Sequence, residues 1–243
     1  KTKATLSTNG AYLQSFCLDD NDILYPETLL EINGQQKKRG GLPILFPWSG
    51  FLENLPQHGF ARNFIWQKLP VHRDSVRKKA LMTLKDNKET FKIFPYHFSC
   101  ELKIELGSKE LFCLLTVFNE DKKEMPIAPG LHPYFKIPQG SFKNLITNIA
   151  GFKPEEYELD KTLFFPLQPV EVLIPTLGKV KIDYGKDFCR KAARLVVWSD
   201  NKSYLCLEAW SAPLGGFLKE EERINLAPGK KAEFSLKIQV FLN

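Results

Sequence analysis

The sequence predicts a single all-β domain over residues 1–243, built as a sandwich or a barrel. In most of its apolar segments, hydrophobic and polar residues alternate with a period of two, which is typical of half-buried strands. These segments are short and turn residues recur between them, whereas no segment keeps a helical apolar period for three full turns. No repeat, low-complexity tract or Gly/Ser linker marks a boundary, so one domain is the economical interpretation.

The individual strands follow from this alternation in chain order. We expect strands at residues 11–18, 63–68, 81–84, 99–106, 111–118, 170–174, 180–184, 195–198, 205–209 and 233–242. Gly107 and Ser108 predict a hairpin turn between two of them. Residues 111–118 are apolar almost throughout, which predicts a strand buried on both faces. The alternation is clearest in the last strand, at the C-terminus.

The composition indicates a globular protein with a modest positive charge. Of its 243 residues, 43% are hydrophobic and 26% are charged, which is enough to bury a substantial core. Its 34 Lys and Arg residues exceed its 28 Asp and Glu residues and give a formal net charge of +6. The basic clusters at residues 37–39 and 77–79 are short and belong to no nucleic-acid-binding module. We therefore expect no nucleic-acid partner and assign the excess charge to a solvated surface or a small anionic ligand.

We expect neither a membrane-spanning segment nor an export signal from this sequence. No apolar run approaches the roughly 18–20 residues of a spanning helix, so no membrane partner is expected. No secretory signal is visible. The five cysteines are scattered and lie mostly in apolar segments, which favours free thiols in a reducing compartment over a disulfide framework. We expect a cytoplasmic protein that is a monomer or a weak dimer.

The common catalytic signatures are missing from the sequence. It has no glycine-rich phosphate loop, no dinucleotide-binding fingerprint, no G-x-S-x-G and no H-E-x-x-H. Its histidines have no cysteine or second histidine at ligand spacing, so we expect no metal and no cofactor. What remains is acid–base chemistry by His, Asp and Glu residues that the fold brings together.

Two histidines and one glutamate are the candidates for this chemistry. His132, followed by Pro133, and His58 lie in loops rich in turn residues, and loops on a rigid scaffold are where sites concentrate. Alternation places Glu208 and Trp210 on one strand face, where a carboxylate beside an aromatic ring suits a sugar ligand. As single residues, the histidines also fit a structural role and Glu208 a solvated face.

Longer stretches of the sequence resemble the aldose 1-epimerase family, and within it the hexose-6-phosphate mutarotase branch. The stretches that carry the resemblance are NGAYLQSF at 9–16, RGGLPILFP at 39–47, PQHGFAR at 56–62, GLHPYF at 130–135, LEAW at 207–210 and LAPG at 226–229. They span nearly the whole chain in the family's order. The resemblance implies a galactose mutarotase-like supersandwich, which is a large twisted antiparallel β-sandwich with its site in a cleft on one sheet.

The resemblance also implies an activity and roles for individual residues. The protein would be an isomerase that interconverts the α and β anomers of hexoses, with hexose 6-phosphates favoured and free hexoses next. Glu208 would remove the proton of the anomeric O1, and His132 would protonate the ring oxygen O5. The residues implied for substrate binding are Gln57, His58, Arg62 and Arg39. Of these, Arg39 would contact the phosphate, which its planar donor fork suits.

Two other functions remain open from the residues. A noncatalytic carbohydrate-binding sandwich would hold His132 and Glu208 too far apart to flank one anomeric centre. A glycosidase would need a second carboxylate about 5–9.5 Å from Glu208. The family's usual substrate-binding aspartate has no clear match in the sequence, and Asp160 is the candidate for it.

Overall fold

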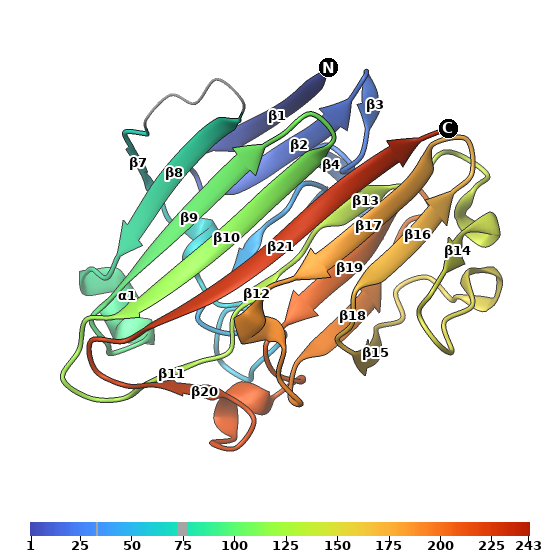
Figure 1. The fold of residues 1–243 in the computed structure, drawn as a ribbon. Coiled ribbons are helices and arrows are strands. Elements are labelled where there is room, and N and C mark those ends of the chain that lie inside the picture. Colours follow the sequence, from blue (N-terminus) through green and yellow to red (C-terminus); the bar gives the residue numbers. More distant parts are fainter. Residues whose placement is uncertain (33, 72–76) are drawn as a thin grey trace.

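The computed structural model describes residues 1–32, 34–71 and 77–243 and consists mostly of antiparallel strands arranged in two large layers (Figure 1). The strands of the first sheet, in order across it, are β14 (Ile146–Thr147), β16 (Val170–Ile174), β17 (Gly178–Tyr184), β21 (Lys231–Leu242), β10 (Glu110–Asn119), β9 (Phe98–Leu106), β8 (Lys78–Lys85) and β7 (Gln67–Leu69). The strands of the second sheet are β15 (Leu163–Pro166), β18 (Arg194–Trp198), β19 (Tyr204–Trp210), β12 (Gly130–Leu131) and β6 (Ile44–Leu45), with β13 (Tyr134–Lys136) also paired to β19. The predicted β-sandwich is confirmed.

Smaller elements surround these two sheets. The short strands are β1 (Thr2–Ser7), β2 (Tyr12–Leu18), β3 (Asn21–Asp22), β4 (Thr28–Ile32), β5 (Gln35–Arg39), β11 (Met125–Ile127) and β20 (Ile224–Leu226). The helices are α1 (Lys88–Ile93) and the 3₁₀ turns Ala61–Asn63, Phe142–Asn144, Pro154–Glu156, Lys186–Phe188 and Gly216–Leu218. None of the helices in the described ranges has the length and apolar character needed to cross a membrane.

The C-terminal strand β21 shows why the alternating segments form this sandwich. Phe234, Leu236 and Ile238 are buried in the main core, whereas Ser235 and Lys237 between them are half-exposed. Successive side chains of a strand point to opposite faces, so the apolar set lies between the two sheets. Burial of these side chains removes apolar surface from water, which is the main favourable contribution to folding.

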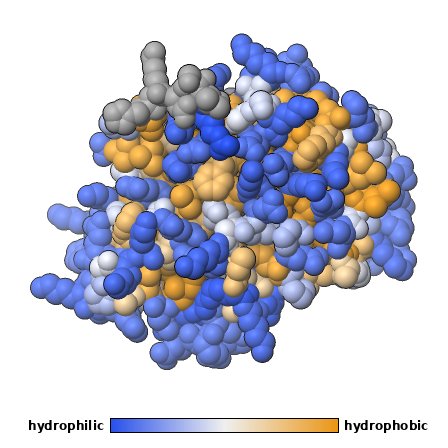
Figure 2. All heavy atoms as spheres, viewed as in Figure 1, coloured by the Kyte–Doolittle hydropathy of each residue, from blue (hydrophilic) through white to orange (hydrophobic). Residues whose placement is uncertain are grey.

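The prediction that residues 111–118 are buried on both faces is wrong. In β10, Phe112, Leu114 and Phe118 are half-exposed, while the residues between them are buried. No further layer of the described chain covers the outer face of the first sheet, where hydrophilic and hydrophobic residues are interspersed (Figure 2). Long polar side chains take the place of a covering layer there, and the Lys103 ammonium lies 5.7 Å from the centre of the Phe112 ring.

The strand expected at residues 63–68 is only partly confirmed. The segment begins in the 3₁₀ turn Ala61–Asn63, Ile65 forms an isolated antiparallel bridge with Asn9, and regular pairing starts at β7. The cause is Trp66, whose buried indole N–H donates to the carbonyl of Ala61 at 3.0 Å and holds the chain in a bend. The other expected strands match strands of the structure within a few residues.

Strand β19 places the functional residues because it is buried on both faces. Leu205, Leu207 and Ala209 point into the main core between the sheets. The alternate residues Glu208 and Trp210 therefore lie on the opposite face of the second sheet, away from the first sheet. The sequence correctly predicted this division of the strand.

Candidate active site

A cavity of about 300 Å³ lies over the face of β19 that carries Glu208. This volume is at the lower end of the range of small-molecule pockets, roughly 300–1,000 Å³. The side chains predicted from the sequence all line it, and they are Arg39, Gln57, His58, Arg62, His132 and Glu208. They come from four separate parts of the chain, so the fold brings together residues that lie far apart in the sequence.

His132 reaches Glu208 because the strand opposite β19 is interrupted. Strands β12 and β13 both pair with β19, through Leu131 opposite Ala209 and Tyr134 opposite Cys206. The ladder breaks between them at Pro133, which has no N–H to donate. His132 occupies this break, and its Nε2 lies 3.2 Å from Oε1 of Glu208.

The imidazole of His132 is enclosed by aromatic rings. It stacks on Tyr134, with ring centres 4.6 Å apart and planes 4° from parallel. Edge contacts with His58 and Trp198 complete the enclosure. Burial, followed by the nearby His58 and Arg62, lowers the pKa of His132 well below its usual value. With its pKa lowered in this way, the imidazole of His132 is neutral at pH 7.

Glu208 is a buried carboxyl with an unusual proton affinity. Its side chain is 3% exposed, and its Oε2 accepts a 2.7 Å hydrogen bond from the indole N–H of Trp210, two residues along the same face. Burial raises the pKa of Glu208 to about 8, although the Trp210 bond and the charge of Arg62 lower it. At pH 7, the pair of Glu208 and His132 thus holds one proton, carried mostly by Glu208.

His58 is held as a fixed hydrogen-bond donor. The backbone N–H of Gly50 donates to its Nδ1 at 3.0 Å, and the backbone N–H of His58 donates to the carbonyl of Gly50 at 2.7 Å. Burial and the Arg62 charge lower the pKa of His58 to about 3, so the ring is neutral. Because Nδ1 accepts, the proton of the neutral ring must be on Nε2.

The tight turn at this point explains the glycine after His58. His58 itself has a positive φ of 62°, and Gly59 follows with φ of 69°. A Cβ on Gly59 would lie 2.1 Å from the carbonyl oxygen of Phe46, so only glycine fits.

Arg62 and Gln57 lie on the same side of the cavity. Arg62 is in the 3₁₀ turn Ala61–Asn63, and its Nη2 donates to the backbone carbonyl of Gln57 at 2.8 Å. Burial lowers the pKa of Arg62, and its charge acts on both Glu208 and His132. Gln57 is exposed and lines the cavity from its rim.

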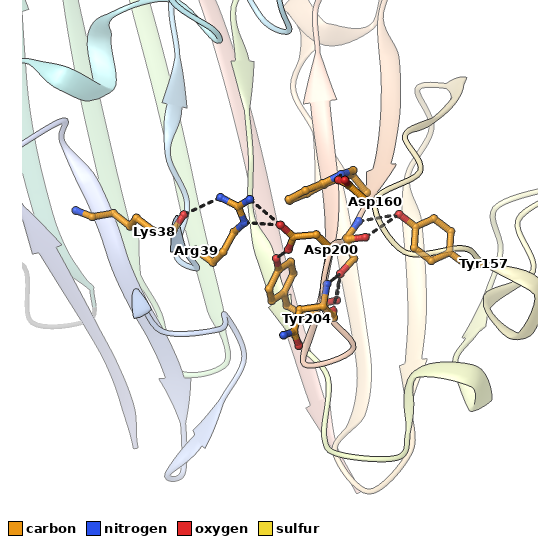
Figure 3. Close-up of polar contacts among 9 residues, drawn as sticks. Lys38, Arg39, Tyr157, Asp160, Asp200 and Tyr204 are labelled. Atoms are coloured by element: carbon orange, nitrogen blue, oxygen red, sulfur yellow. Dashed lines mark hydrogen bonds and ion pairs between the residues drawn. The ribbon is translucent and has the colours of Figure 1, made fainter. Parts of the chain in front are cut away.

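Arg39 lines the cavity from the end of β5 but is already paired. Its Nε and Nη2 donate to Oδ2 of Asp200 at 3.0 and 2.6 Å, and its Nη1 donates to the carbonyl of Lys38 at 3.0 Å (Figure 3). The guanidinium also lies over the ring of Trp198, 5.2 Å from its centre. The sequence placed Arg39 at the site but gave no sign of its partner Asp200.

Several other cavity residues were not predicted. Tyr134 and Trp198 line the cavity, and strand alternation would have found Trp198, because Val196 pairs with Glu208 and Trp198 lies on the same face two residues later. Asp160, the candidate for a substrate-binding aspartate, does not line the cavity. It accepts a 3.2 Å hydrogen bond from the Trp198 indole instead.

In the part of the chain that the structure describes, the site has His58, His132 and Glu208 but not the arrangement of a metal centre. Within the described ranges, no three His, Cys, Asp or Glu side chains are placed to hold a metal ion. Among the described residues that line the cavity, Glu208 is the only carboxylate.

Known proteins resemble this chain in both sequence and fold. A protein of Escherichia coli K12, provisionally named a glucose-6-phosphate 1-epimerase, is 28% identical over 140 residues, which cover 56% of this chain and 46% of that protein. A plant protein of Cenchrus ciliaris with the same provisional name is 33% identical over 106 residues, covering 40% of this chain and 32% of that protein. The matched part thus spans less than half the length of these curated relatives.

Solved structures match the fold over the full length of the chain. A protein of Synechocystis sp. PCC 6803 has a TM-score of 0.85 at 22% identity, with 100% of this chain and 92% of that chain covered. A galactose 1-epimerase of Lactobacillus acidophilus NCFM has a TM-score of 0.73 at 14% identity, with 100% and 92% covered. The model of the aldose 1-epimerase family matches residues 1–239. The chain therefore belongs to the aldose 1-epimerase family.

Proposed function

We propose that the protein interconverts the α and β anomers of hexoses, with hexose 6-phosphates favoured and free hexoses next. The observation that carries the proposal is the 3.2 Å contact between Nε2 of His132 and Oε1 of Glu208 in a cavity lined by sugar-binding residue types. The anomeric O1 and the ring oxygen O5 are bonded to the same carbon. An acid and a base that address both oxygens must therefore lie within a few ångströms of each other, as these two groups do.

The reaction needs one proton on the pair of residues. In the reactive form, Glu208 is ionised and His132 is protonated, which requires a proton to pass from Oε1 to Nε2 across their contact. Glu208 then takes the O1 proton, the O1–H electrons form the C1=O1 double bond, and the C1–O5 bond breaks. His132 gives its proton to O5, which leaves an open-chain aldehyde with a hydroxyl at C5.

Ring closure on the other face completes the reaction. The C1–C2 bond rotates, the C5 hydroxyl returns its proton to His132 as O5 attacks C1, and Glu208 returns a proton to O1. In the open-chain stage, Glu208 is protonated and His132 is neutral. This is the protonation state that their raised and lowered pKa values favour, so the buried pair stabilises the intermediate.

Four neighbours would hold the sugar or its phosphate during this exchange. The Nε2–H of His58 is a fixed donor for a sugar oxygen, and Arg62 offers a positive charge beside the developing charge at O5. Gln57 would bind a hydroxyl from the rim. Arg39 and Arg62 would provide the donors for a phosphate at C6, in line with the provisional names of the curated relatives.

The two alternative functions have less support. A noncatalytic sugar-binding sandwich would not need the acid and the base in contact, and they are 3.2 Å apart. A glycosidase would need a second carboxylate facing the sugar, and among the described residues that line the cavity Glu208 is the only one.

Saturation-transfer NMR tests the proposal directly. The protein should accelerate anomer exchange of glucose 6-phosphate, and less strongly that of glucose and galactose, over the spontaneous rate in buffer alone. Methyl glucoside, which has no proton on O1, should be neither exchanged nor hydrolysed. The proposal is wrong if none of the three sugars exchanges faster, and release of glucose from the methyl glucoside would favour a glycosidase instead.

A further inference from the structure

Arg39 lines the cavity and is held from behind by an ion pair with Asp200, which does not itself line the cavity. The Asp200 side chain is 5% exposed and the Arg39 side chain is 16% exposed. One carboxylate oxygen of Asp200 accepts two hydrogen bonds from Arg39, and the other accepts one from the hydroxyl of Tyr204 (Figure 3). Both oxygens of this buried carboxylate are therefore committed within the protein.

The loop that carries Asp200 is fixed by its own hydrogen bonds. Between β18 and β19, the hydroxyl of Ser199 donates to the carbonyls of Asn201 and Tyr204, and the side chain of Asn201 accepts from the N–H of Ser203. Tyr157 holds the loop from outside by accepting from the N–H of Ser199 at 2.8 Å (Figure 3). Asp200 is thus a fixed countercharge.

The pair determines which donors of Arg39 remain available. Arg39 has five N–H donors, and Asp200 and the carbonyl of Lys38 use three of them. One N–H on Nη1 and one on Nη2 remain, on adjacent corners of the guanidinium. The ring of Trp198, whose centre lies 5.2 Å from the guanidinium carbon, bounds this group on one side.

The pair also determines the charge that a ligand meets. Asp200 balances the charge of Arg39, and His58 and His132 are neutral in the free protein because their pKa values are lowered. Among the described residues lining the cavity, Arg62 is then the one cation without a carboxylate partner in a salt bridge. A phosphate dianion would meet donors in this cavity but little excess positive charge.

Stability alone gives little reason to keep such a pair. Removing two charges from water is costly, and a buried ion pair often contributes no more than apolar residues of the same size. We propose that Asp200 is a specificity-determining residue that presents Arg39 to the sugar and cancels its charge, so that the cavity accepts free hexoses beside hexose 6-phosphates. This inference rests on the proposed function and names the residue that sets its substrate preference.

The substitution Asp200→Asn tests the inference. Asparagine has nearly the same shape and can still accept from Arg39, but it leaves the guanidinium charge unbalanced. We expect the ratio of kcat/KM for glucose 6-phosphate to kcat/KM for glucose to rise about tenfold, and the gain to shrink as salt is added. A merely structural residue would lower both values together and leave the ratio unchanged.

Two further variants test whether a change in the kcat/KM ratio comes from the charge of Arg39. Glu158→Gln removes one negative charge from an exposed position near the same loop, and it should leave the ratio unchanged. Arg39→Met combined with Asp200→Asn replaces the pair by two neutral side chains. It should lose the preference for glucose 6-phosphate, which separates the charge of Arg39 from the packing of the pair.

Binding of inorganic phosphate tests Asp200 without any turnover. Calorimetry should show phosphate binding Asp200→Asn about tenfold more tightly than the unchanged protein, and the double variant more weakly. If the unchanged protein accelerates no anomer exchange, the proposed function fails while the phosphate measurement still decides the role of Asp200. Equal phosphate affinity in the unchanged protein and Asp200→Asn overturns the inference, as does an unchanged substrate ratio.

Discussion

Nε2 of His132 and Oε1 of Glu208 are 3.2 Å apart, and neither side chain is more than 6% exposed. At this separation, with almost no water between them, the two groups bind protons as a unit. The titration of the pair, and not that of either residue alone, should therefore control how the activity depends on pH.

The pH profile of kcat/KM should therefore be level around pH 7 and fall at high pH. Because the pKa of Glu208 is raised to about 8, the pair keeps its single proton below that pH and loses it above. The rate should fall about tenfold for each pH unit beyond it. Anomer exchange measured from pH 5 to 10, with spontaneous exchange subtracted, checks this. A rate that rises through pH 8 would show that ionised Glu208 acts alone and that the acid is another group.

Glu208→Gln should lower activity and raise stability at high pH. Loss of the base should slow anomer exchange about 10²–10⁴-fold. The folded protein raises the pKa of this carboxyl from 4.5 to about 8, so its stabilising contribution is complete below pH 4.5 and is lost as pH rises through 8. Glutamine cannot ionise, can accept from Trp210 and can donate to His132.

Urea unfolding of both proteins measures the effect on stability. The variant should be more stable than the unchanged protein by about 2–4 kcal/mol at pH 9, and the difference should nearly vanish at pH 5. A variant that is less stable at pH 9 would contradict the interpretation that Glu208 is held protonated by burial.

Trp210→Phe should move the high-pH limb of the kcat/KM profile to higher pH. The indole N–H bond to Oε2 lowers the pKa of Glu208, so removing the donor raises that pKa beyond about 8. Trp198→Phe is the matched control, because the Trp198 indole donates to Asp160 and not to Glu208. A limb that shifts equally in both variants would mean that general loss of aromatic packing is the cause.

Two substitutions of His58 separate its structural role from its chemical role. His58→Ala leaves the buried N–H of Gly50 without an acceptor and puts alanine at a φ of 62°, which should cost about 1–3 kcal/mol of stability. Asparagine tolerates this φ, and its carbonyl can replace Nδ1. His58→Asn should therefore keep most of the stability.

Both His58 variants should lose activity, because neither has a donor at the position of Nε2. A loss of about 10²-fold is typical when one donor to a developing charge is removed. Urea unfolding and anomer exchange are measured on the same samples. Full activity in His58→Asn would show that Nε2–H does not contact the substrate.

The sequence predicted the sandwich because alternation is a local pattern, whereas Arg39, Gln57 and Arg62 became site candidates only through the resemblance to the aldose 1-epimerase family. Alternation along β19 was enough to put Glu208 and Trp210 on one face, and turn residues marked the loops of His58 and His132. Patterns do not reveal what covers a face, so the exposed side of β10 was predicted to be buried.

Long-range pairing was the other limit of prediction. Asp200 lies in what reads as an ordinary hairpin turn, 161 residues from Arg39 in the sequence. A single carboxylate in a turn has many polar partners available, so only the three-dimensional structure identifies Arg39 as its partner. The same holds for the bend at Trp66, which a contact with Ala61 imposes on an apparently extended segment.

The placement of β19, with the core on one face and the cavity on the other, bears on attempts to alter this protein by directed evolution. A substitution at Leu207 or Ala209 would shift the base on the strand's other face, so selection should reject most changes there. Phe51 and Leu214 line the cavity yet are 63% and 52% exposed. Variants with new substrate ranges should accumulate their substitutions at these two positions, where side chains can change size without disturbing the strand beneath.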